Sequence, residues 1–202
     1  MLPLGNIIER IKKKWMRFAL RGVSYSNNYR RLNMIYVVAN PWRLDSAREE
    51  VRFAETNRLI TENIGRVGSL LEVGSGEGYQ SFYLRQVCEH LTGMDVSGRA
   101  VKRARKRCPD VDFIVGDIFS ETAQRKAPFD LVVACEVLYY MKDVAAALQR
   151  LQTLGSHCLV TYLAREFNNL DPLVLSMPRV AHGIIEFQDA KWRVAWWPII
   201  ER

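Results

Sequence analysis

Histidine and cysteine are scarce in this sequence. Its three histidines, at positions 90, 157 and 182, lie far apart and match no spacing of a metal-binding motif. Its four cysteines, at positions 88, 108, 135 and 158, include no Cys-x-x-Cys pair, which disfavours both a zinc site and a disulfide framework. We therefore expect a cytoplasmic protein with reduced thiols and no bound metal.

Long apolar runs are also absent. No run reaches the roughly 18 residues that a membrane-spanning helix requires. Three successive lysines at positions 12–14 interrupt the N-terminal segment before the apolar core of a signal peptide could form. The hydrophobic fraction of 49% is ordinary for a globular protein, and 202 residues suffice for one domain with a full core. We expect a single domain over residues 1–202.

A glycine-rich turn follows a strongly hydrophobic stretch. Residues 70–79 read Leu-Leu-Glu-Val-Gly-Ser-Gly-Glu-Gly-Tyr, which predicts a buried strand, a tight turn and the start of a helix. The spacing is Gly-x-Gly-x-Gly, because Tyr79 stands where dinucleotide-binding proteins have their third glycine. Glu72 precedes the turn, and a carboxylate there repels a pyrophosphate but favours a cationic ligand. S-adenosylmethionine, with its sulfonium and ammonium groups, is such a ligand.

The next three apolar stretches also end in acidic residues. Asp95, followed by Val96, lies roughly 20 residues after the turn, where α/β nucleotide-binding proteins place the carboxylate that accepts both ribose hydroxyls. Gly116-Asp117-Ile118 ends the following stretch, and an acidic residue followed by an apolar one suits the amino group and ring face of adenine. Cys135-Glu136 ends the fourth. Because ligands of open α/β sheets bind at the carboxyl ends of the strands, we expect one crevice here.

These motifs resemble those of class I S-adenosylmethionine-dependent methyltransferases, and the resemblance covers residues 29–162. Two segments, Asn40-Pro41-Trp42-Arg43 and Cys135-Glu136-Val137-Leu138-Tyr139-Tyr140, are similar to the nodulation N-methyltransferases called NodS. The resemblance implies S-adenosylmethionine as cofactor and a small-molecule amine as acceptor, such as the free amino sugar of a chitin oligosaccharide. The implied cofactor contacts are Trp42, Arg43, Glu72, Gly74, Ser75, Gly76, Gly78, Tyr79, Asp95, Val96, Gly116, Asp117, Ile118, Cys135 and Glu136.

Three residues after the fourth strand are candidates for the chemistry. A carboxylate such as Glu136 can orient an attacking amine and accept its proton. Tyr139 or Tyr140 can place an aromatic face near the sulfonium. Structural roles are the alternatives: the tyrosines as packing aromatics, Glu72 and Asp95 as caps of the turn and the next helix, and Asp117 as a turn residue. No histidine lies directly after this strand, where many small-molecule O-methyltransferases of the class that these motifs resemble have their base, and this departure favours an amine over a hydroxyl acceptor.

The remaining pattern predicts the architecture. We expect an α/β, Rossmann-like class I methyltransferase fold: a seven-stranded, mostly parallel sheet with a C-terminal antiparallel hairpin over residues 180–198 and an N-terminal helical cap. Residues 1–64 form the cap or lid, and residues 65–202 the cofactor-binding core. Ser46-Ala47-Arg48-Glu49 is typical of a capping box that starts a helix reaching residue 64. Further helices are expected over residues 80–89, 98–107 and 142–154, and an irregular segment over 120–127.

The net charge of +7 raises the question of polyanionic partners. One basic cluster, over residues 99–107, shares its helix with an apolar stripe, so we interpret it as a solvated face and expect no nucleic acid partner. The basic amphipathic helix over residues 6–20 is either a lid or a surface for a weak membrane or partner contact. A methyltransferase acting on RNA or protein, and a non-catalytic S-adenosylmethionine-binding or membrane-associated module, remain as alternative functions.

Overall fold

The computed structural model describes residues 4–198, with side chains from residue 14 onward and at residues 10 and 11. A central sheet has the strand order β3-β2-β1-β4-β5-β7-β6. The first five strands run parallel, and β7 is antiparallel to both β5 and β6. The strands are β1 Val67–Val73, β2 Cys88–Asp95, β3 Asp112–Val115, β4 Phe129–Cys135, β5 Gly155–Leu163, β6 Ala181–Phe187 and β7 Ala190–Pro198. The predicted seven-stranded, mostly parallel sheet with a C-terminal hairpin is confirmed.

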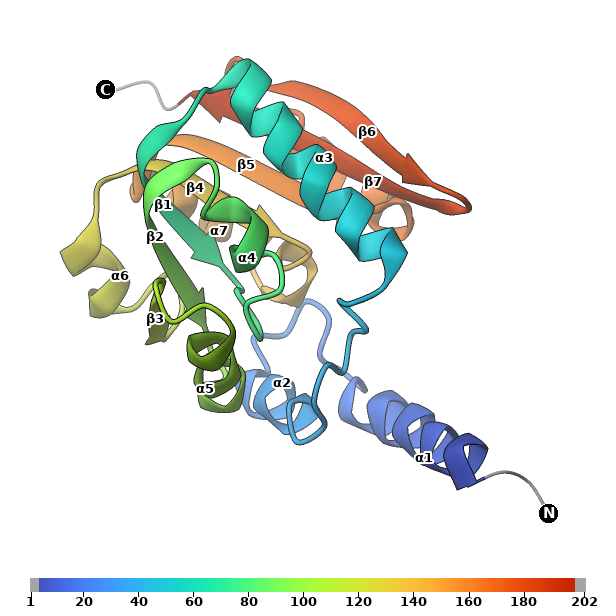
Figure 1. Cartoon of the computed structure of the whole chain (residues 1–202). Helices are drawn as coiled ribbons and strands as arrows, with labels where there is room; N and C mark the ends of the chain where they lie inside the picture. The colour runs from blue at the N-terminus through green and yellow to red at the C-terminus, as the bar shows by residue number, and fades with distance from the viewer. Residues whose placement is uncertain (1–3, 199–202) are drawn as a thin grey trace.

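Helices cover both faces of this sheet (Figure 1). On one face Ile60, Leu84 and Val101, from three different helices, share a hydrophobic cluster with Leu70 and Leu131 of the sheet. These helices are α3 Ala47–Asn63, α4 Ser81–Leu84 and α5 Gly98–Arg107. The opposite face is covered by α6 Glu121–Lys126, α7 Val144–Gln152 and α8 Phe167–Val174. The central strands β1 and β4 are therefore buried on both sides, which explains their nearly continuous hydrophobic sequences.

The remaining N-terminal elements lie beside the carboxyl ends of the strands. They are α1 Leu4–Ala19, which projects from the body in Figure 1, and α2 Tyr29–Ile35. Ala19, Val23, Leu32 and Ile35 form a third hydrophobic cluster. The backbone N–H of Tyr25 donates to the carbonyl of Tyr139 at 2.9 Å, which ties this region to the segment after β4. The predicted helix over residues 6–20 is present, but the side chains of residues 7, 8, 12 and 13 lie outside the described part.

Three local predictions are wrong. The helix expected over residues 80–89 is only the four-residue α4, because Cys88 already pairs with Val67 as the first residue of β2. The segment expected to be irregular forms α6, since the Ser120 hydroxyl accepts from the N–H of Ala123 and caps it. Ser46 does precede α3, but its side chain makes no capping hydrogen bond.

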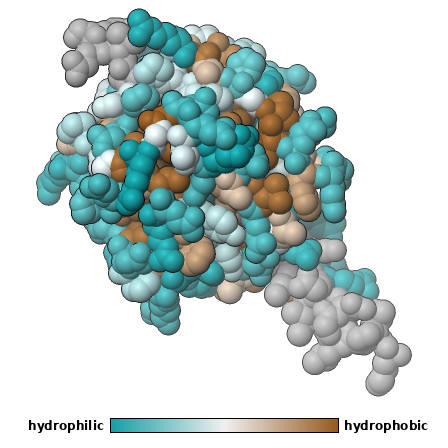
Figure 2. All heavy atoms as spheres, turned by 45° about the horizontal axis from the view of Figure 1, so that its top comes forward, coloured by the Kyte–Doolittle hydropathy of each residue, from teal (hydrophilic) through white to brown (hydrophobic). Residues whose placement is uncertain are grey.

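The surface of the molecule carries mostly polar side chains. On the face seen in Figure 2, hydrophilic residues separate small groups of hydrophobic ones. Two of the larger exposed apolar side chains, Phe82 and Ile184, lie on different elements, α4 and β6. Within residues 4–198, no helix is long and apolar enough to cross a membrane.

Candidate functional site

A cavity of about 490 Å³ opens at the carboxyl ends of β1, β2 and β4, within the usual size range of small-molecule sites. Residues from α2 and the following loop close one side of it, and residues from α3 and the end of β5 close another. The sequence-predicted residues that line it are Trp42, Glu72, Gly74, Ser75, Gly76, Asp95, Val96, Gly116, Asp117, Ile118, Cys135, Glu136, Tyr139 and Tyr140.

Three predicted cofactor residues do not reach the cavity wall. Arg43 is exposed and does not line the cavity, although its neighbours Trp42 and Leu44 do. Gly78 faces α5 instead, because a Cβ there would lie 3.2 Å from the Cα of Ala104. Tyr79 stacks under the guanidinium of Arg107, whose central carbon is 3.5 Å from the ring centroid. The close approach to α5 thus accounts for the position of Gly78, and stacking on Arg107 accounts for that of Tyr79.

Gly76 lies in the glycine-rich turn, beside Tyr36 of the N-terminal segment. Its φ is +54°, a conformation that residues with a Cβ rarely adopt. A Cβ there would lie 3.0 Å from the hydroxyl oxygen of Tyr36, which itself lines the cavity. Glycine is therefore favoured both by the backbone conformation and by the narrow space.

Asp95, at the end of β2, holds the turn in place. One carboxylate oxygen accepts from the N–H of Gly76 at 2.9 Å, and the other accepts from the N–H of Ser97 at 2.8 Å. The helix cap itself is Ser97, whose hydroxyl accepts from the N–H of Ala100. Asp95 is therefore not the cap residue of α5. Burial raises the pKa of Asp95 to about 6, and the two backbone hydrogen bonds limit that rise.

Glu72, in β1, is the second buried carboxylate of the cavity. It accepts a short hydrogen bond from the hydroxyl of Ser81, the first residue of α4. Burial raises the pKa of Glu72 to about 7, although the Ser81 hydrogen bond and the Arg52 charge act in the opposite direction. At neutral pH this carboxyl group is thus poised between its neutral and charged forms, so a cationic ligand would favour ionisation.

Glu136, Tyr139 and Tyr140 form another side of the cavity, after β4. Glu136 has a φ of +59°, an uncommon conformation for a non-glycine residue that is concentrated at functional sites. Its carboxylate accepts from the hydroxyls of Tyr139 at 3.1 Å and Thr161 at 3.3 Å. Burial raises the pKa of Glu136, and the nearby Arg52 limits this effect. The rings of Tyr140 and Trp42 lie 6.0 Å apart, so the two NodS-like segments meet across the cavity.

Sequence reasoning missed a buried polar group on α3. Arg52 is 2% exposed and lines the cavity. It donates to Glu49 at 2.8 Å and to the side-chain oxygen of Gln80 at 3.0 Å. The Gln80 amide in turn lies 3.2 Å from the sulfur of Cys135. The available signal was Glu49, which we interpreted as part of a capping box, with an arginine three residues later.

The hydroxyl of Ser75 indicates what kind of ligand the cavity can bind. Its side chain is 4% exposed, it lines the cavity, and its hydroxyl has no hydrogen-bond partner among the described residues. Buried hydroxyls are normally paired, so a hydroxyl without a partner beside Asp95 and Glu72 suits a polar ligand.

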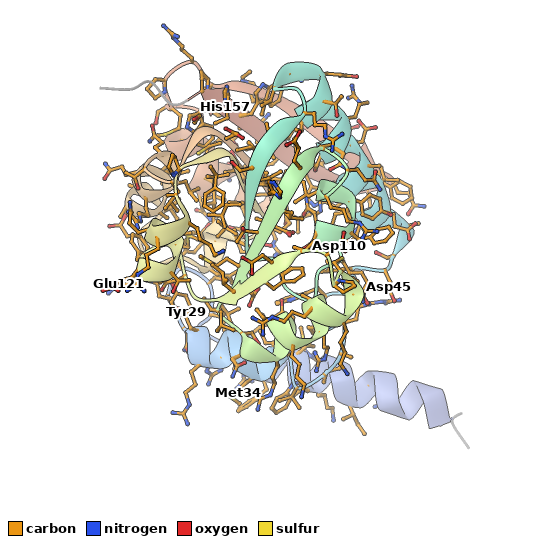
Figure 3. All side chains as sticks on the ribbon, turned by 60° about the vertical axis from the view of Figure 1, so that its left-hand side comes forward. Tyr29, Met34, Asp45, Asp110, Glu121 and His157 are labelled. Carbon is orange, nitrogen blue, oxygen red and sulfur yellow. The ribbon has the colours of Figure 1, made fainter. Side chains whose placement is uncertain are left out.

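Within residues 4–198, no group of three His, Cys, Asp or Glu side chains is placed to hold a metal ion. His157 lies at the far end of the sheet from Tyr29, which lines the cavity (Figure 3).

Comparison with known proteins agrees with this geometry. The family model of Nodulation protein S (NodS) matches residues 25–161. Nodulation protein S from Sinorhizobium fredii is 37% identical over 134 residues, 64% of this chain and 61% of the relative. The one from Bradyrhizobium diazoefficiens is 37% identical over 140 residues, 66% of this chain and 65% of the relative. The chain thus aligns with less than two thirds of the length of these curated relatives.

Solved structures extend the similarity to the whole fold. The crystal structure of the N-methyltransferase NodS from Bradyrhizobium japonicum, in complex with S-adenosyl-L-homocysteine, has a TM-score of 0.71 and 26% identity. It covers 87% of this chain and 100% of that one. The magnesium protoporphyrin IX methyltransferase of Synechocystis, with a TM-score of 0.60 and 16% identity, shares the fold alone. The fold is thus that of class I methyltransferases, as the sequence predicts. The match over residues 25–161 shows that this chain belongs to the nodulation protein S family.

Proposed function

We propose that this protein is an S-adenosylmethionine-dependent methyltransferase that methylates a small-molecule amine, such as an amino sugar. The observation that carries the proposal is the cavity itself, where the buried carboxyl groups of Glu72 and Asp95 flank a glycine-rich turn. The similar NodS structure holds the demethylated form of this cofactor, which supports the same ligand class here.

The residues of the cavity fit this cofactor. Asp95 retains acceptor capacity for the ribose hydroxyls beyond its two backbone hydrogen bonds, since a carboxylate has about four lone-pair sites. The Ser75 hydroxyl has no hydrogen-bond partner in the part of the chain that the structure describes and can bond a polar ligand atom. Gly116, Asp117 and Ile118 supply an acidic and an apolar side chain for the adenine. The acidic residues repel the phosphates of a dinucleotide, as Glu72 already suggests from its sequence position.

The chain's own contribution to the chemistry is positioning and proton handling. The bound cofactor supplies an electrophilic methyl group to a nucleophile. Glu136 accepts the proton of the attacking amine, and its raised pKa brings it closer to the pH at which it works. Tyr139 holds the Glu136 carboxylate through its hydroxyl. Trp42 and Tyr140 exclude water and offer aromatic faces to a sulfonium. We propose Glu136, Tyr139 and Tyr140 as the residues nearest the chemistry.

Binding and transfer assays test this function separately. Calorimetry with S-adenosylmethionine, S-adenosylhomocysteine and NAD should detect binding of the first two only. Transfer of a labelled methyl group should then occur to a chitin oligosaccharide with one free amine and not to its fully N-acetylated form. Tight binding of NAD without a response to either sulfur-containing ligand would contradict the proposal.

Polyanionic acceptors are the second candidate. Several basic side chains of α5 are engaged within the protein: Arg107 donates to the carbonyl of Glu77, and Arg99 to that of Asn33. We therefore favour a small-molecule acceptor over RNA or protein. The exposed residues Arg10, Lys14 and Arg17 of α1 leave a weak contact with a membrane surface or an acidic partner as an additional role. Binding to polyanions that weakens steeply with salt would favour this second candidate.

The four buried free cysteines suit a cytoplasmic location.

A further inference from the structure

The loop after α2 is fastened to α5 by one arginine. Arg103 donates from Nη2 to the carbonyl of Tyr36 at 2.7 Å and from Nη1 to the carbonyl of Val38 at 3.4 Å. The same Nη1 forms a short ion pair with Glu77. Arg103 belongs to the basic cluster that we expected to be a solvated face, and for this residue that interpretation is wrong. A planar guanidinium can bond several acceptors at once, which a lysine cannot reproduce.

Glu77 connects the same loop to the glycine-rich turn. It stands between Gly76 and Gly78, and its side chain is 4% exposed, compared with 32% for Arg103. While one carboxylate oxygen pairs with Arg103, the other accepts from the backbone N–H of Asn40 at 2.9 Å. The Asn40 side chain then accepts from the N–H of Leu44 at 2.8 Å, which fixes the turn that contains Trp42. The pair thus holds the loop at residues 36, 38 and 40, and the Asn40 side chain extends this hold to residue 44.

The fastened loop supplies part of the cavity wall. Tyr36, Trp42 and Leu44 all line the cavity. The indole N–H of Trp42 donates to the hydroxyl of Tyr36 at 3.2 Å, and this hydroxyl lies 3.0 Å from the position that a Cβ at residue 76 would occupy. Any movement of the loop away from α5 therefore also removes side chains that cover the glycine-rich turn.

We propose that Arg103 and Glu77 are a positioning pair that holds residues 36–44 over the cavity and thereby sets the rate at which the cofactor is released. Neither residue lines the cavity, so they act through Tyr36 and Trp42 and not by touching the ligand. The identity of the ligand rests on the proposed function. The fastening of the loop does not, because it is made of contacts within the protein.

Variants of Arg103 test the pair directly. Arg103→Met removes the guanidinium group and its charge. Arg103→Lys keeps the positive charge but not the planar guanidinium that bonds the loop carbonyls. Lys106→Met, an exposed position on the same helix, is the matched control for the lost charge. We expect Arg103→Met to raise the dissociation rate of S-adenosylhomocysteine about tenfold, the effect of weakening closure by about 1.4 kcal/mol. Stopped-flow tryptophan fluorescence measures it. Arg103→Lys should fall between wild type and Arg103→Met, and Lys106→Met should match wild type.

Two further readouts separate positioning from general stability. Without ligand, limited proteolysis of Arg103→Met should be faster within residues 36–44 than in the Lys106→Met protein. In turnover, KM for the cofactor should rise while kcat at saturating cofactor changes little. In a double-mutant cycle, adding Glu77→Gln to Arg103→Met should change the release rate less than Glu77→Gln does alone.

A lower melting temperature of Arg103→Met with unchanged release rate and unchanged proteolysis would overturn the positioning role. Equal effects of Lys106→Met and Arg103→Met would also overturn it, because charge alone would then be the cause. If wild type does not bind S-adenosylhomocysteine at all, the proposed function fails. The ligand-free proteolysis still decides whether the pair fastens the loop.

Discussion

Asp95→Ala changes two properties that the structure links. The substitution removes the acceptor of two buried backbone donors, the N–H groups of Gly76 and Ser97. Each buried donor left without a partner costs about 1–3 kcal/mol, and relief from burying a carboxylate offsets part of this sum. We expect the free energy of unfolding of the ligand-free protein to fall by roughly 1–4 kcal/mol. The sequence alone suggests little change, because it does not reveal that this carboxylate also supports the turn.

The same substitution should weaken cofactor binding. Loss of two charge-assisted hydrogen bonds to ribose hydroxyls, partly replaced by water, corresponds to about 2–4 kcal/mol, or roughly 30- to 1,000-fold in Kd. Calorimetry with S-adenosylhomocysteine at a temperature where the variant is fully folded measures this. Asp95→Asn keeps one acceptor oxygen and should lie between wild type and Asp95→Ala. Asp110→Ala, which removes an exposed carboxylate paired with Arg85, is the control and should change neither quantity by more than about 1 kcal/mol.

The two readouts can refute the reasoning independently. A folded Asp95→Ala protein with unchanged affinity would show that Asp95 serves the turn only and does not bind ribose. Lost affinity with unchanged ligand-free stability would show that the hydrogen bonds to Gly76 and Ser97 contribute nothing net.

Three other outcomes follow from the cavity. Gly76→Val should abolish S-adenosylhomocysteine binding in a folded protein, because the φ of +54° and the 3.0 Å approach to Tyr36 leave no room; retained affinity in calorimetry would contradict this. Burial raises the pKa of Glu72 from 4.5 to about 7, so its contribution to ligand-free stability should be lost as pH rises through that range. Binding of the cationic cofactor should release protons from the protein in the same range, and the affinity for the cofactor should increase as pH rises. Denaturation and calorimetry at several pH values test it, and Glu72→Gln should reduce the slope of both profiles, with the remainder coming from Asp95, whose pKa burial raises to about 6. Glu136→Gln should keep cofactor affinity but lower kcat by roughly 10²- to 10⁴-fold, and a variant with full turnover on its true acceptor would rule out the proton-accepting role.

The strand ends could be predicted from the sequence because the signal there is local. A continuous apolar stretch buried on both faces ends at a turn with a polar residue, and Glu72, Asp95 and Glu136 all follow this pattern. The expected α5 boundaries, residues 98–107, equal the observed ones because Ser97 caps the helix and Cys108 follows its last turn. Such features depend on residues a few positions apart.

The remaining polar groups of the site could not be predicted, because their partners lie far away in the sequence. Arg52 is buried only because α3 places it against Gln80, 28 residues later. The local sequence around Arg103 is typical of a solvated helix face. Its side chain is engaged because the loop after α2 supplies carbonyl groups that accept its hydrogen bonds. In both cases tertiary pairing, and not the local pattern, decides whether the charge faces water.

The distribution of charge divides the cavity into two chemically different halves. On the β1–β2 side, Glu72 and Asp95 form no ion pair with any residue that the structure describes, and burial raises the pKa of both, so a bound cation would favour their ionised forms. On the β4 side, the charge of Arg52 lowers the pKa of Glu136 while burial raises it, and Tyr139 fixes the carboxylate by a hydrogen bond. A carboxylate held between these opposing influences is suited to take up a proton during turnover and release it afterwards. We therefore propose that the half with Glu72 and Asp95 attracts the positive charge of the methyl donor and that the half with Glu136 exchanges protons with the acceptor, a division that suits methyl transfer to an amine.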